Sequence, residues 1–572
     1  MEIFGRKTVI STRFMSVFVA SMVSMVSAYI LILTDNVVAG QIVGEDAVAA
    51  MTLVFPIFTM ILFVSYVVSD GLVMMASFAQ GRGDREEVDR LFSLGIILSV
   101  ICSAVFFSAL VLFKAEILAF WEISPHLKVY AGEYYDGLKF LSLIQFVNIF
   151  LYTIFVAEGR ENECLVAAGA AFVVNVALDI ILCEKIGVEG IALASVMGTV
   201  SSFIVQLYYM RGARNNLHFR WYWNAKKVWQ GIFYSFYHSV DTLCMSILPV
   251  LLSYTVLKFF GEGDLIIVTV AVNLLTLIIA VYTGMVDCLQ PMICQYHAEK
   301  NLHSVIKTMR VGIAATVAVS LIMTALGMIF ANILPTFFGV EEPELVEKAA
   351  VAMRFFLPFT VFLGVTLMFA NYYIYIEELN FGAAIKILLL LILPAVGMLI
   401  GARFSLNIFW LSVGAAFAVA FVAVRLLAKF YKKSSNLLLI GEKEIARQLS
   451  YDVDAAAEEI LALTKKVDAD LTRLKVPKRT RNKLVLFVEE FGMHAAERAG
   501  EKIFQLEFSI LLGEKDSATL IIRDNGEPYD IIKTANEGEF SFREFFIEGV
   551  TANVVSRNYL ASGDENRVVL QI

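Results

Sequence analysis

The sequence predicts an all-α polytopic membrane protein of twelve transmembrane helices in two six-helix pseudo-repeats, followed by a small cytoplasmic α/β sandwich domain. Composition is the first observation: 58% of the 572 residues are hydrophobic and only 17% are charged, a balance that soluble chains rarely reach. Second, long apolar stretches recur up to about Tyr431, whereas the chain from Ser434 onward has the composition of a soluble protein. The third observation is a match of the chain with itself at a fixed offset.

Twelve stretches are long and apolar enough to cross a membrane. A span needs about 20 largely apolar residues, and its backbone must satisfy its own hydrogen bonds as a helix. The predicted spans are 12–34, 52–79, 91–113, 134–157, 163–183, 188–210, 232–259, 265–293, 309–334, 350–376, 382–402 and 406–430. We interpret the first as an uncleaved span rather than a signal peptide, because no clear small-residue cleavage site ends it.

Lys and Arg are biased toward one set of loops. With the N-terminus inside, the inside segments hold 20 Lys and Arg, Lys386 among them, and the outside segments with their flanks hold eight. Positive residues concentrate on the cytoplasmic side of a membrane. The bias predicts a multi-pass protein of the cell membrane with both termini, and therefore the soluble tail, in the cytoplasm.

The two halves of the apolar region match each other at an offset of 217 residues, which places Gly44 on Gly261 and Asp70 on Asp287. Six spans separate equivalent positions, so both halves keep one orientation. Two such halves that rock about a site at their interface give alternating access in transporters. The predicted domains are six-helix bundles at 1–215 and 216–433 and a cytoplasmic domain at 434–572.

Three segments resemble the multidrug and toxic compound extrusion (MATE) family. Residues 35–44 read DNVVAGQIVG, residues 175–182 read NVALDIIL, and residues 187–195 read GVEGIALAS. The last two are similar to the family's N-x-x-L-D … G-V-x-G-x-A-x-A passage. The resemblance covers about residues 10–430 and implies an antiporter that exports small organic compounds. The superfamily also contains flippases for lipid-linked precursors, and this alternative stays open.

Acidic residues inside predicted spans are candidates for functional sites, because a charge is costly in hydrocarbon. In family members of this type, an acidic pair on helices 1 and 5 binds Na⁺ or H⁺, and by resemblance Asp35, Asn175 and Asp179 fall on those positions. Asn175 and Asp179 are four residues apart and share one helix face. Hard oxygen ligands suit Na⁺, and a desolvated carboxylate suits H⁺. Thr199 is a candidate for a further oxygen ligand.

Asp70, Asp241, Asp287 and His238 are candidates for the substrate cavity. Asp70 and Asp287 occupy equivalent places in the two halves, so we expect them to face each other and to give the cavity a negative charge that suits cations. Asp241 is similar to a helix-7 acid of some sodium-coupled members, although Phe233 replaces the usual proline. His238 is expected either to pair with Asp241 or to be a satisfied core histidine. We expect no intramembrane Lys or Arg as a structural partner for these acids.

The tail predicts an α/β domain from its alternating and helical patterns. A linker at 434–442 precedes expected helices at 442–470 and 481–499, strands at 505–512 and 518–523, a helix at 545–557 and a strand at 567–572. Its 18 Lys and Arg against 24 Asp and Glu argue against nucleic acid as a partner.

This order resembles the histidine-kinase-like ATPase domains of the anti-sigma-factor type. Glu490 and His494 stand where that family has its E-x-x-x-N-A helix, and Asp524 and Gly526 stand in a D-x-G loop. By resemblance the Glu activates water or substrate, the Asn position holds Mg²⁺ and the Asp reads adenine. Because His replaces the Asn, and Gly549 is the one glycine where a lid should be, we expect a degenerate module that docks a regulatory protein rather than one that binds ATP and Mg²⁺.

Together these patterns predict a cation-coupled exporter of small, cationic organic compounds with a cytoplasmic regulatory domain, not an enzyme. We expect no catalytic residues, no metal centre and no required cofactor, and the partners are the bilayer, a small-molecule substrate and a regulatory protein. All six cysteines lie in the apolar part without a CxxC pair, which is typical of packing residues. A membrane sensor that signals through the tail is a third interpretation. The sequence leaves open the substrate, Na⁺ against H⁺, and the oligomeric state.

Overall fold

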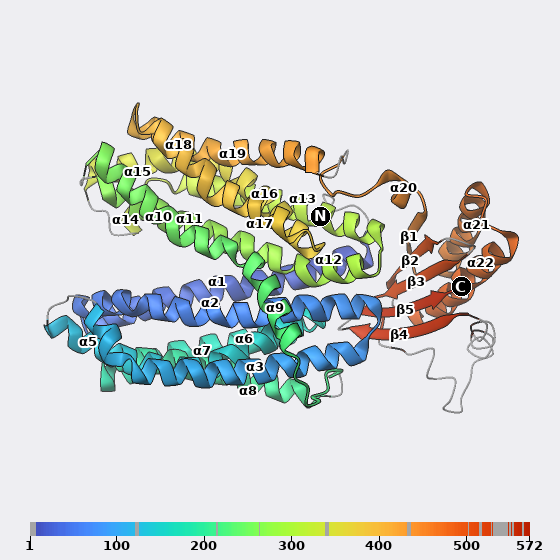
Figure 1. Ribbon diagram of the computed structural model, residues 1–572, viewed down its shortest axis with the longest axis horizontal. Helices are drawn as coiled ribbons and strands as arrows, with labels where there is room; N and C mark the ends of the chain where they lie inside the picture. The colour runs from blue at the N-terminus through green and yellow to red at the C-terminus, as the bar shows by residue number, and fades with distance from the viewer. Residues whose placement is uncertain are drawn as a thin grey trace.

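The computed structural model describes residues 7–120, 125–212, 215–261, 264–337, 342–431, 436–500, 503–513, 517–527, 529, 547, 551, 554–562 and 565–572. Its first group of helices, along one side of the long bundle in Figure 1, is α1 (Val9–Ile42), α2 (Glu45–Arg82), α3 (Arg85–Leu112), α4 (Lys114–Phe120), α5 (Pro125–Leu138), α6 (Leu141–Ala157), α7 (Glu161–Ile186) and α8 (Val188–Met210). We call this group the N-terminal half.

The C-terminal half lies along the other side of the bundle (Figure 1). It comprises α9 (Ala225–His238), α10 (Val240–Phe259), α11 (Leu265–Asp287), α12 (Leu289–Ala298), α13 (Leu302–Ile329), α14 (Leu334–Phe337), α15 (Pro343–Phe356), the 3₁₀ turn η3 (Leu357–Phe359), α16 (Thr360–Tyr375), α17 (Leu379–Ile387), the π-helical turn η4 (Leu388–Ile392), α18 (Leu393–Gly401) and α19 (Leu406–Tyr431).

Ten helices among the described residues are long and apolar enough to span a membrane. The number becomes eleven if α5 and α6, which are bent by 46° at their junction, form one span. The first predicted span lies within α1. Among the described residues, α1 has two apolar stretches, Val9–Ser24 and Ile30–Ile42, and each is shorter than a full span. The structure therefore agrees with a polytopic helical protein, and the total of twelve spans stays a prediction.

Besides the 3₁₀ turn η3 between α15 and α16, three helices of the C-terminal half are interrupted among the described residues. The chain breaks at Ser239 between α9 and α10 and at Cys288 between α11 and α12, and the π-helical turn η4 separates α17 from α18. Interruptions of this kind recur where membrane helices build binding sites, because backbone released from the helix ladder needs other partners. All three interruptions lie next to charged side chains.

The two halves approach each other closely at two pairs of positions. A Cβ added to Gly71 of α2 would lie 1.8 Å from the carbonyl oxygen of Gly231 of α9, and one added to Gly81 would lie 2.3 Å from the carbonyl oxygen of Gln295 of α12. Glycine is therefore required at both places for the backbones to meet. The halves are packed together along this end of the bundle.

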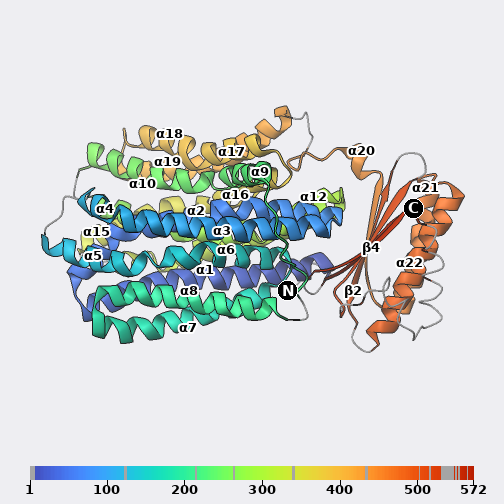
Figure 2. The same ribbon diagram turned by 60° about the horizontal axis from the view of Figure 1, so that its bottom comes forward.

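The described residues of the C-terminal domain form a five-stranded antiparallel sheet, two long helices and one short helix. Strands β1 (Gln448–Asp454), β2 (Gln505–Leu512), β3 (Ala518–Asp524), β4 (Ser556–Ser562) and β5 (Glu565–Gln571) are ordered β1-β2-β3-β5-β4, and α20 (Glu442–Ile445), α21 (Ala457–Arg473) and α22 (Lys478–Ala499) complete it. Figure 2 shows α21 and α22 on the sheet face that points away from the bundle.

The sequence interpretation was right for four elements of this domain and wrong for one. The second helix and the strands at 505–512, 518–523 and 567–572 are present as α22, β2, β3 and β5. The helix expected over 442–470 is instead α20, β1 and α21, because Leu449, Tyr451 and Val453 alternate and pack against the domain core. Most of the helix expected at 545–557 lies outside the described residues, and β4 begins at Ser556.

The two faces of the sheet differ in chemistry. Phe508, Leu520 and Leu570 are fully buried against the helices, whereas the alternate residues Glu507 and Arg523 point to the other face. A polar sheet face is usually solvated. Here both charged side chains are 0% exposed, because this face is docked on the end of the helical bundle.

Candidate functional site

The N-terminal half holds two acidic side chains in contact with each other. Asp35 comes from α1 and Asp179 from α7, and their carboxyl groups lie close enough to repel each other when both are ionised. A proton or a cation between two carboxyl groups this close would relieve their repulsion. Asp35 Oδ1 and Asp179 Oδ1 are buried and have no hydrogen-bond partner among the described residues. This geometry fits a small hard cation or a proton.

Ser195 of α8 links this pair to the predicted asparagine. Its hydroxyl donates to Asp35 Oδ2 over 3.3 Å, and the side-chain amide of Asn175 lies 3.1 Å from the Ser195 hydroxyl oxygen. With its amide flipped, Asn175 donates to Asp179 Oδ2 over 3.1 Å and accepts from the Ser195 amide. The two helices come this close because Gly198 packs on Asn175, where a Cβ would lie 3.0 Å from the asparagine Cβ.

Thr199 lies one turn beyond Ser195, and its hydroxyl donates to the Ser195 carbonyl oxygen over 3.1 Å. The structure thus places Asp35, Asn175 and Asp179 together as predicted. The sequence reasoning quoted Ser195 in a motif but did not choose it as a ligand. Its spacing of four residues from Thr199 on one helix face is the signal that could have found it.

The interface between the halves holds a second cluster of charged groups, which includes all four predicted cavity residues. His238, the last residue of α9, has Nδ1 at 3.2 Å from Asp70 Oδ2 of α2 and Nε2 at 3.8 Å from Asp287 Oδ1 of α11. The same Nε2 lies 3.1 Å from the Tyr375 hydroxyl of α16. Asp70 and Asp287 therefore face a common histidine, which the sequence reasoning had offered to Asp241 instead.

Lys386 corrects one sequence-based expectation. We expected no intramembrane cation beside these acids, and we counted Lys386 among the loop residues. The structure buries it completely on α17, with Nζ at 3.5 Å from Asp241 Oδ1 and in a hydrogen bond to the His238 carbonyl oxygen. The π-helical turn η4 follows directly and shifts the helix register there. Lys386 lies four residues inside the predicted span 382–402, and its inclusion among the inside segments concealed this pair.

The C-terminal domain contacts the N-terminal half through strand β5. Arg13 of α1 lies 2.6 Å from Glu565, and both side chains are buried. Arg567 donates to the carbonyl oxygens of Gln80 and Gly81 over 2.8 and 2.7 Å. These carbonyls end α2, so the guanidinium caps the negative end of the helix dipole.

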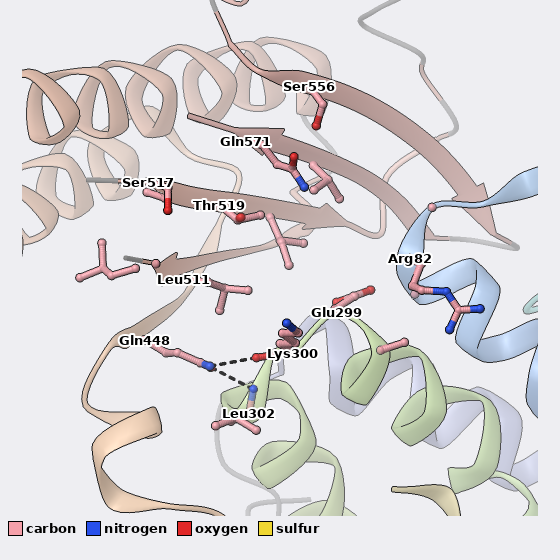
Figure 3. Close-up of a pocket in the computed structure, with 18 of the residues that line it drawn as sticks. Arg82, Glu299, Lys300, Leu302, Gln448, Leu511, Ser517, Thr519, Ser556 and Gln571 are labelled. Atoms are coloured by element: carbon pink, nitrogen blue, oxygen red, sulfur yellow. Dashed lines mark hydrogen bonds between the residues drawn. The ribbon is translucent and has the colours of Figure 1, made fainter. Parts of the chain in front are cut away.

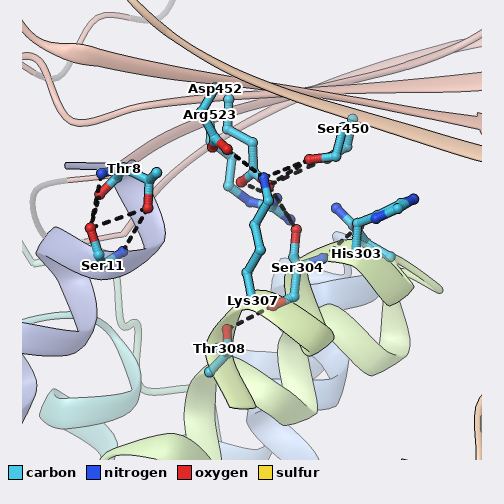
Figure 4. A network of polar contacts seen from close by, with 12 residues as sticks. Thr8, Ser11, His303, Ser304, Lys307, Thr308, Ser450, Asp452 and Arg523 are labelled. Atoms are coloured by element: carbon cyan, nitrogen blue, oxygen red, sulfur yellow. Dashed lines mark hydrogen bonds and ion pairs between the residues drawn. The ribbon is translucent and has the colours of Figure 1, made fainter. Parts of the chain in front are cut away.

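The same sheet face contacts the C-terminal half through charged and polar groups (Figure 4). Arg523 is ion-paired with Glu299, and Arg567 Nε lies 3.2 Å from the same carboxylate. Lys307 of α13 lies 2.8 Å from Asp452 Oδ2 and 3.4 Å from Glu507 Oε1. Each half of the bundle is thus bound to the same sheet.

Charge pairing keeps these buried groups ionised. Burial alone would raise the pKa of Glu507, but Arg523 and Lys307 outweigh it and hold this pKa below its usual value. Burial would lower the pKa of Arg523, yet Glu299 and Glu507 raise it well above the usual value. Removal of one partner would leave the other as an unpaired buried charge, which is strongly unfavourable.

The residues proposed for a nucleotide lie on the opposite, helix-covered side of the sheet. Asp524 Oδ1 accepts from Asn566 over 2.8 Å, from the Gly526 amide over 3.0 Å and from Arg498 over 3.3 Å. Burial raises the pKa of Asp524 in spite of these donors. His494 on α22 lies against the Tyr529 ring. Most of the expected lid lies outside the described residues.

Comparison with known proteins places this geometry in a family. The MatE family profile matches residues 20–181 and again 239–400, together more than half of the chain. The chain belongs to the MatE family of transporters. A MATE chain of this kind is a multi-pass membrane protein, in agreement with its apolar helices. The matched segments contain Asp35, Asp179 and Asp287 and end before the C-terminal domain.

One curated relative is the probable multidrug resistance protein YoeA of Bacillus subtilis (strain 168), which is 25% identical to this MATE chain over 202 residues. The match covers 33% of this chain, and the chain spans less than half, 42%, of the relative's length. Similar solved structures include a MATE protein in complex with MaL6, at 20% identity and a TM-score of 0.68 over 76% of this chain and 99% of that one.

A second solved structure is a MOP superfamily transporter from Pyrococcus furiosus, described as having a binding pocket of reversed polarity that suggests a different function. It is 19% identical, with a TM-score of 0.68 over 76% of this MATE chain and 98% of that one. These similarities show that the helical bundle has the MATE fold. The C-terminal domain lies outside the matched family segments.

Proposed function

We propose that this MATE protein is a Na⁺- or H⁺-coupled antiporter that exports small, cationic organic compounds by alternating access. The contact between Asp35 and Asp179 is the observation that carries the proposal. A pair of carboxyl groups that must hold a proton or a cation gives two states of different charge. Exchange of that cation for substrate couples the gradient to export.

Lys386 and His238 set the charge of the proposed substrate cavity. Three carboxylates, from Asp70, Asp241 and Asp287, face one lysine and one histidine. The cluster therefore carries a net negative charge while His238 is neutral, which favours cationic substrates. Asp287 is the most accessible of the three acids, with 33% of its side chain exposed, and is the strongest candidate for direct substrate contact.

The twelve-span, two-repeat arrangement belongs to the same proposal. Two matches of one family profile, at 20–181 and 239–400, support two repeats. The predicted offset also brings Gly83 onto Lys300, and both residues have positive φ before the N-cap of a helix. With Lys and Arg concentrated at that end, we infer that both termini and the C-terminal domain are cytoplasmic.

The C-terminal domain is proposed to regulate this exporter as a clamp. Arg567 bonds the end of α2 in one half and Glu299 in the other. Glu565 pairs with Arg13 of the N-terminal half and lies 3.1 Å from Arg523, which holds Glu299. Opening toward the cytoplasm requires these ends to separate, so a domain bound to both halves favours the state that is closed on this side.

A degenerate histidine-kinase-like ATPase fold for this domain remains our proposal from the sequence. The carboxylate that would read adenine is engaged by Arg498 and Asn566, which argues against ATP and Mg²⁺ as ligands. A cytoplasmic regulatory protein that releases the clamp is the partner that suits such a domain.

Efflux of a fluorescent organic cation from cells that express the protein tests the main proposal. We expect wild-type efflux to depend on an imposed Na⁺ or pH gradient and Asp179→Asn to lose this dependence. Well-folded wild-type protein without cation efflux under either gradient would contradict it. The flippase and sensor interpretations would then be tested instead.

A further inference from the structure

A cleft of about 750 Å³ lies between the C-terminal domain and the ends of both halves (Figure 3). Its walls are the turn after α2 with Arg82, the turn after α12 with Lys300, and strand residues such as Thr519 and Gln571. The cleft opens on the polar face of the sheet. It is therefore separate from Asp524 and the other nucleotide candidates, which lie on the face covered by helices.

Basic side chains dominate the charge of this cleft. Arg82, Lys300, Arg447 and Arg567 line it, against Glu299 and Glu444. Glu299 is already neutralised, because Arg523 and Arg567 both pair with it. The basic groups come from the N-terminal half, the C-terminal half and the C-terminal domain. The remaining potential is positive and favours an anion.

Neutral donors in the same walls suit a ligand with several oxygens. Gln571 offers a side-chain amide, and Thr519 offers a hydroxyl. In Figure 3, Ser517, Thr519 and Gln571 lie on the strand side, facing the turn that carries Lys300. A phosphate group, with its multiple acceptor oxygens, matches this mixture of charged and neutral donors.

Lys300 adds an independent observation, because it occupies a backbone conformation that favours glycine. Its φ is 60°, and the position equivalent by the internal offset is Gly83, with φ of 77°. Both residues precede an N-cap, Asp84 of α3 and Asn301 of α13. One half thus uses glycine in this turn and the other accepts strain to place a lysine in the cleft. Strain of this kind is often found at functional sites.

We propose that the cleft is a regulatory site for a phosphate-bearing anion, bound by Lys300 of the C-terminal half and Arg447 of the C-terminal domain. A ligand held by both residues joins the domain to that half, while Arg567 and Glu565 keep it on the N-terminal half. Binding therefore tightens the clamp and slows transport. This effect rests on the proposed clamp function, whereas binding itself does not.

The phosphate can come from a soluble anion or from a lipid headgroup, because the cleft lies at the end of the bundle. Purified full-length protein in detergent is titrated with pyrophosphate by calorimetry at fixed salt. In parallel, nanodiscs of phosphatidylglycerol and of phosphatidylcholine are compared by the hydrogen exchange of β1 and α13. Saturable pyrophosphate binding identifies a soluble ligand, and protection only in phosphatidylglycerol identifies a lipid.

Three variants test the residues. Lys300→Gln and Arg447→Gln should each weaken binding about tenfold, as expected for the loss of one charge-assisted contact. Lys300→Gly should weaken it equally while it relieves the strained φ, so loss of binding cannot be attributed to a damaged turn. Arg473→Gln is the matched control, because Arg473 belongs to the same domain, does not line the cleft and has 76% of its side chain exposed, and it should change affinity less than about twofold.

Two results would overturn the site: neither probe binds or protects the wild-type protein, or Arg473→Gln weakens binding as much as Lys300→Gln. Binding with unchanged efflux would instead count against the clamp function, because the titration does not depend on transport.

Discussion

The ammonium of Lys386 lies 3.5 Å from the carboxylate of Asp241 inside the helical bundle. Lys386 comes from α17 and Asp241 from the first turn of α10, just after the break at Ser239. The lysine also donates to the carbonyl oxygen of His238, which precedes that break. Lys386 thus pairs with Asp241 and also gives a hydrogen bond to the His238 carbonyl oxygen at the helix interruption. This contact fixes the position of the histidine that faces Asp70 and Asp287.

Removal of one member of this pair should be more harmful than removal of both. Lys386→Met leaves Asp241 without its cation in a site of low polarity, and breaking a buried pair typically costs about 3–5 kcal/mol. We expect a large fall in the thermal stability of the purified protein. Lys386→Met combined with Asp241→Asn should recover most of it. A double variant as unstable as the single one would show that the ion pair is not the cause.

Asp179→Asn should abolish gradient-driven efflux without unfolding the protein. The amide cannot release a proton or neutralise a bound cation, yet it keeps the shape of the side chain. Asp35→Asn should have the same effect, because the two carboxyl groups act as a pair. Initial efflux rates under an imposed gradient measure both.

Asp46→Asn is the matched control for this pair. Asp46 is an acid in the first turn of α2, and 64% of its side chain is exposed. It should retain wild-type efflux. Equal loss of efflux in Asp46→Asn would show that the assay reports general damage rather than coupling.

The polar residues of the N-terminal half could be predicted because they lie in short, specific motifs. Asn175 and Asp179 are four residues apart on one helix, so their shared face follows from helix geometry. Spacing places Ser195 on the same helix face as Thr199, but its contact with Asp35 depends on how α8 packs on α7 at Gly198, which is a tertiary relationship. The apolar helices were predictable from hydropathy alone.

Lys386 and the docked sheet could not be predicted for a different reason. A lysine at the edge of an apolar stretch has the same sequence signature whether it is in a loop or paired inside the bundle. Likewise, alternation in β2 and β3 indicates which residues share a face but not whether water or another domain covers the polar face. Arg523 and Glu299 form an ion pair although they are more than 200 residues apart in the sequence, so no local pattern predicts their contact.

Docking of the C-terminal domain should be lost in acid. Glu507 has its pKa held below the usual value of 4.5 in the docked state, by Arg523 and Lys307. A lowered pKa contributes stability that is present above 4.5 and is lost as the pH falls through the lowered value. We expect the domain to stay docked at neutral pH, to loosen as the pH falls below 4.5 and to separate as the pH passes the lowered pKa of Glu507.

The distance between a spin label on the domain and one on the bundle, in a variant without the six native cysteines, measures this separation. Glu507→Gln should weaken docking at neutral pH and reduce its dependence on acid. Two results together would rule out the ionisation of Glu507 as a cause of docking. The domain would stay docked at pH values well below 4.5, and Glu507→Gln would dock like the wild type.

Arg567→Met should release the clamp, because its guanidinium is bound to both halves at once. It loses two bonds to the carbonyls of α2 and the pair with Glu299, and a lost contact to a charged group weakens docking by about 1.5–3 kcal/mol. The helix end of α2 also loses its cap. We therefore expect a larger fraction of protein open on the domain side and faster efflux. Labelling of a cysteine placed at Ala79, which is fully buried near that end of α2, measures the opening.

Arg473→Met is the control for this variant, since Arg473 belongs to the same domain but its side chain is 76% exposed on the face away from the bundle. It should label and transport like the wild type. If Arg567→Met speeds the labelling of Ala79→Cys but leaves efflux unchanged, opening on the domain side is not the rate-limiting step of transport. Unchanged labelling would contradict the clamp, because a domain that bridges both halves through Arg567 cannot lose that residue without loosening the end it holds together.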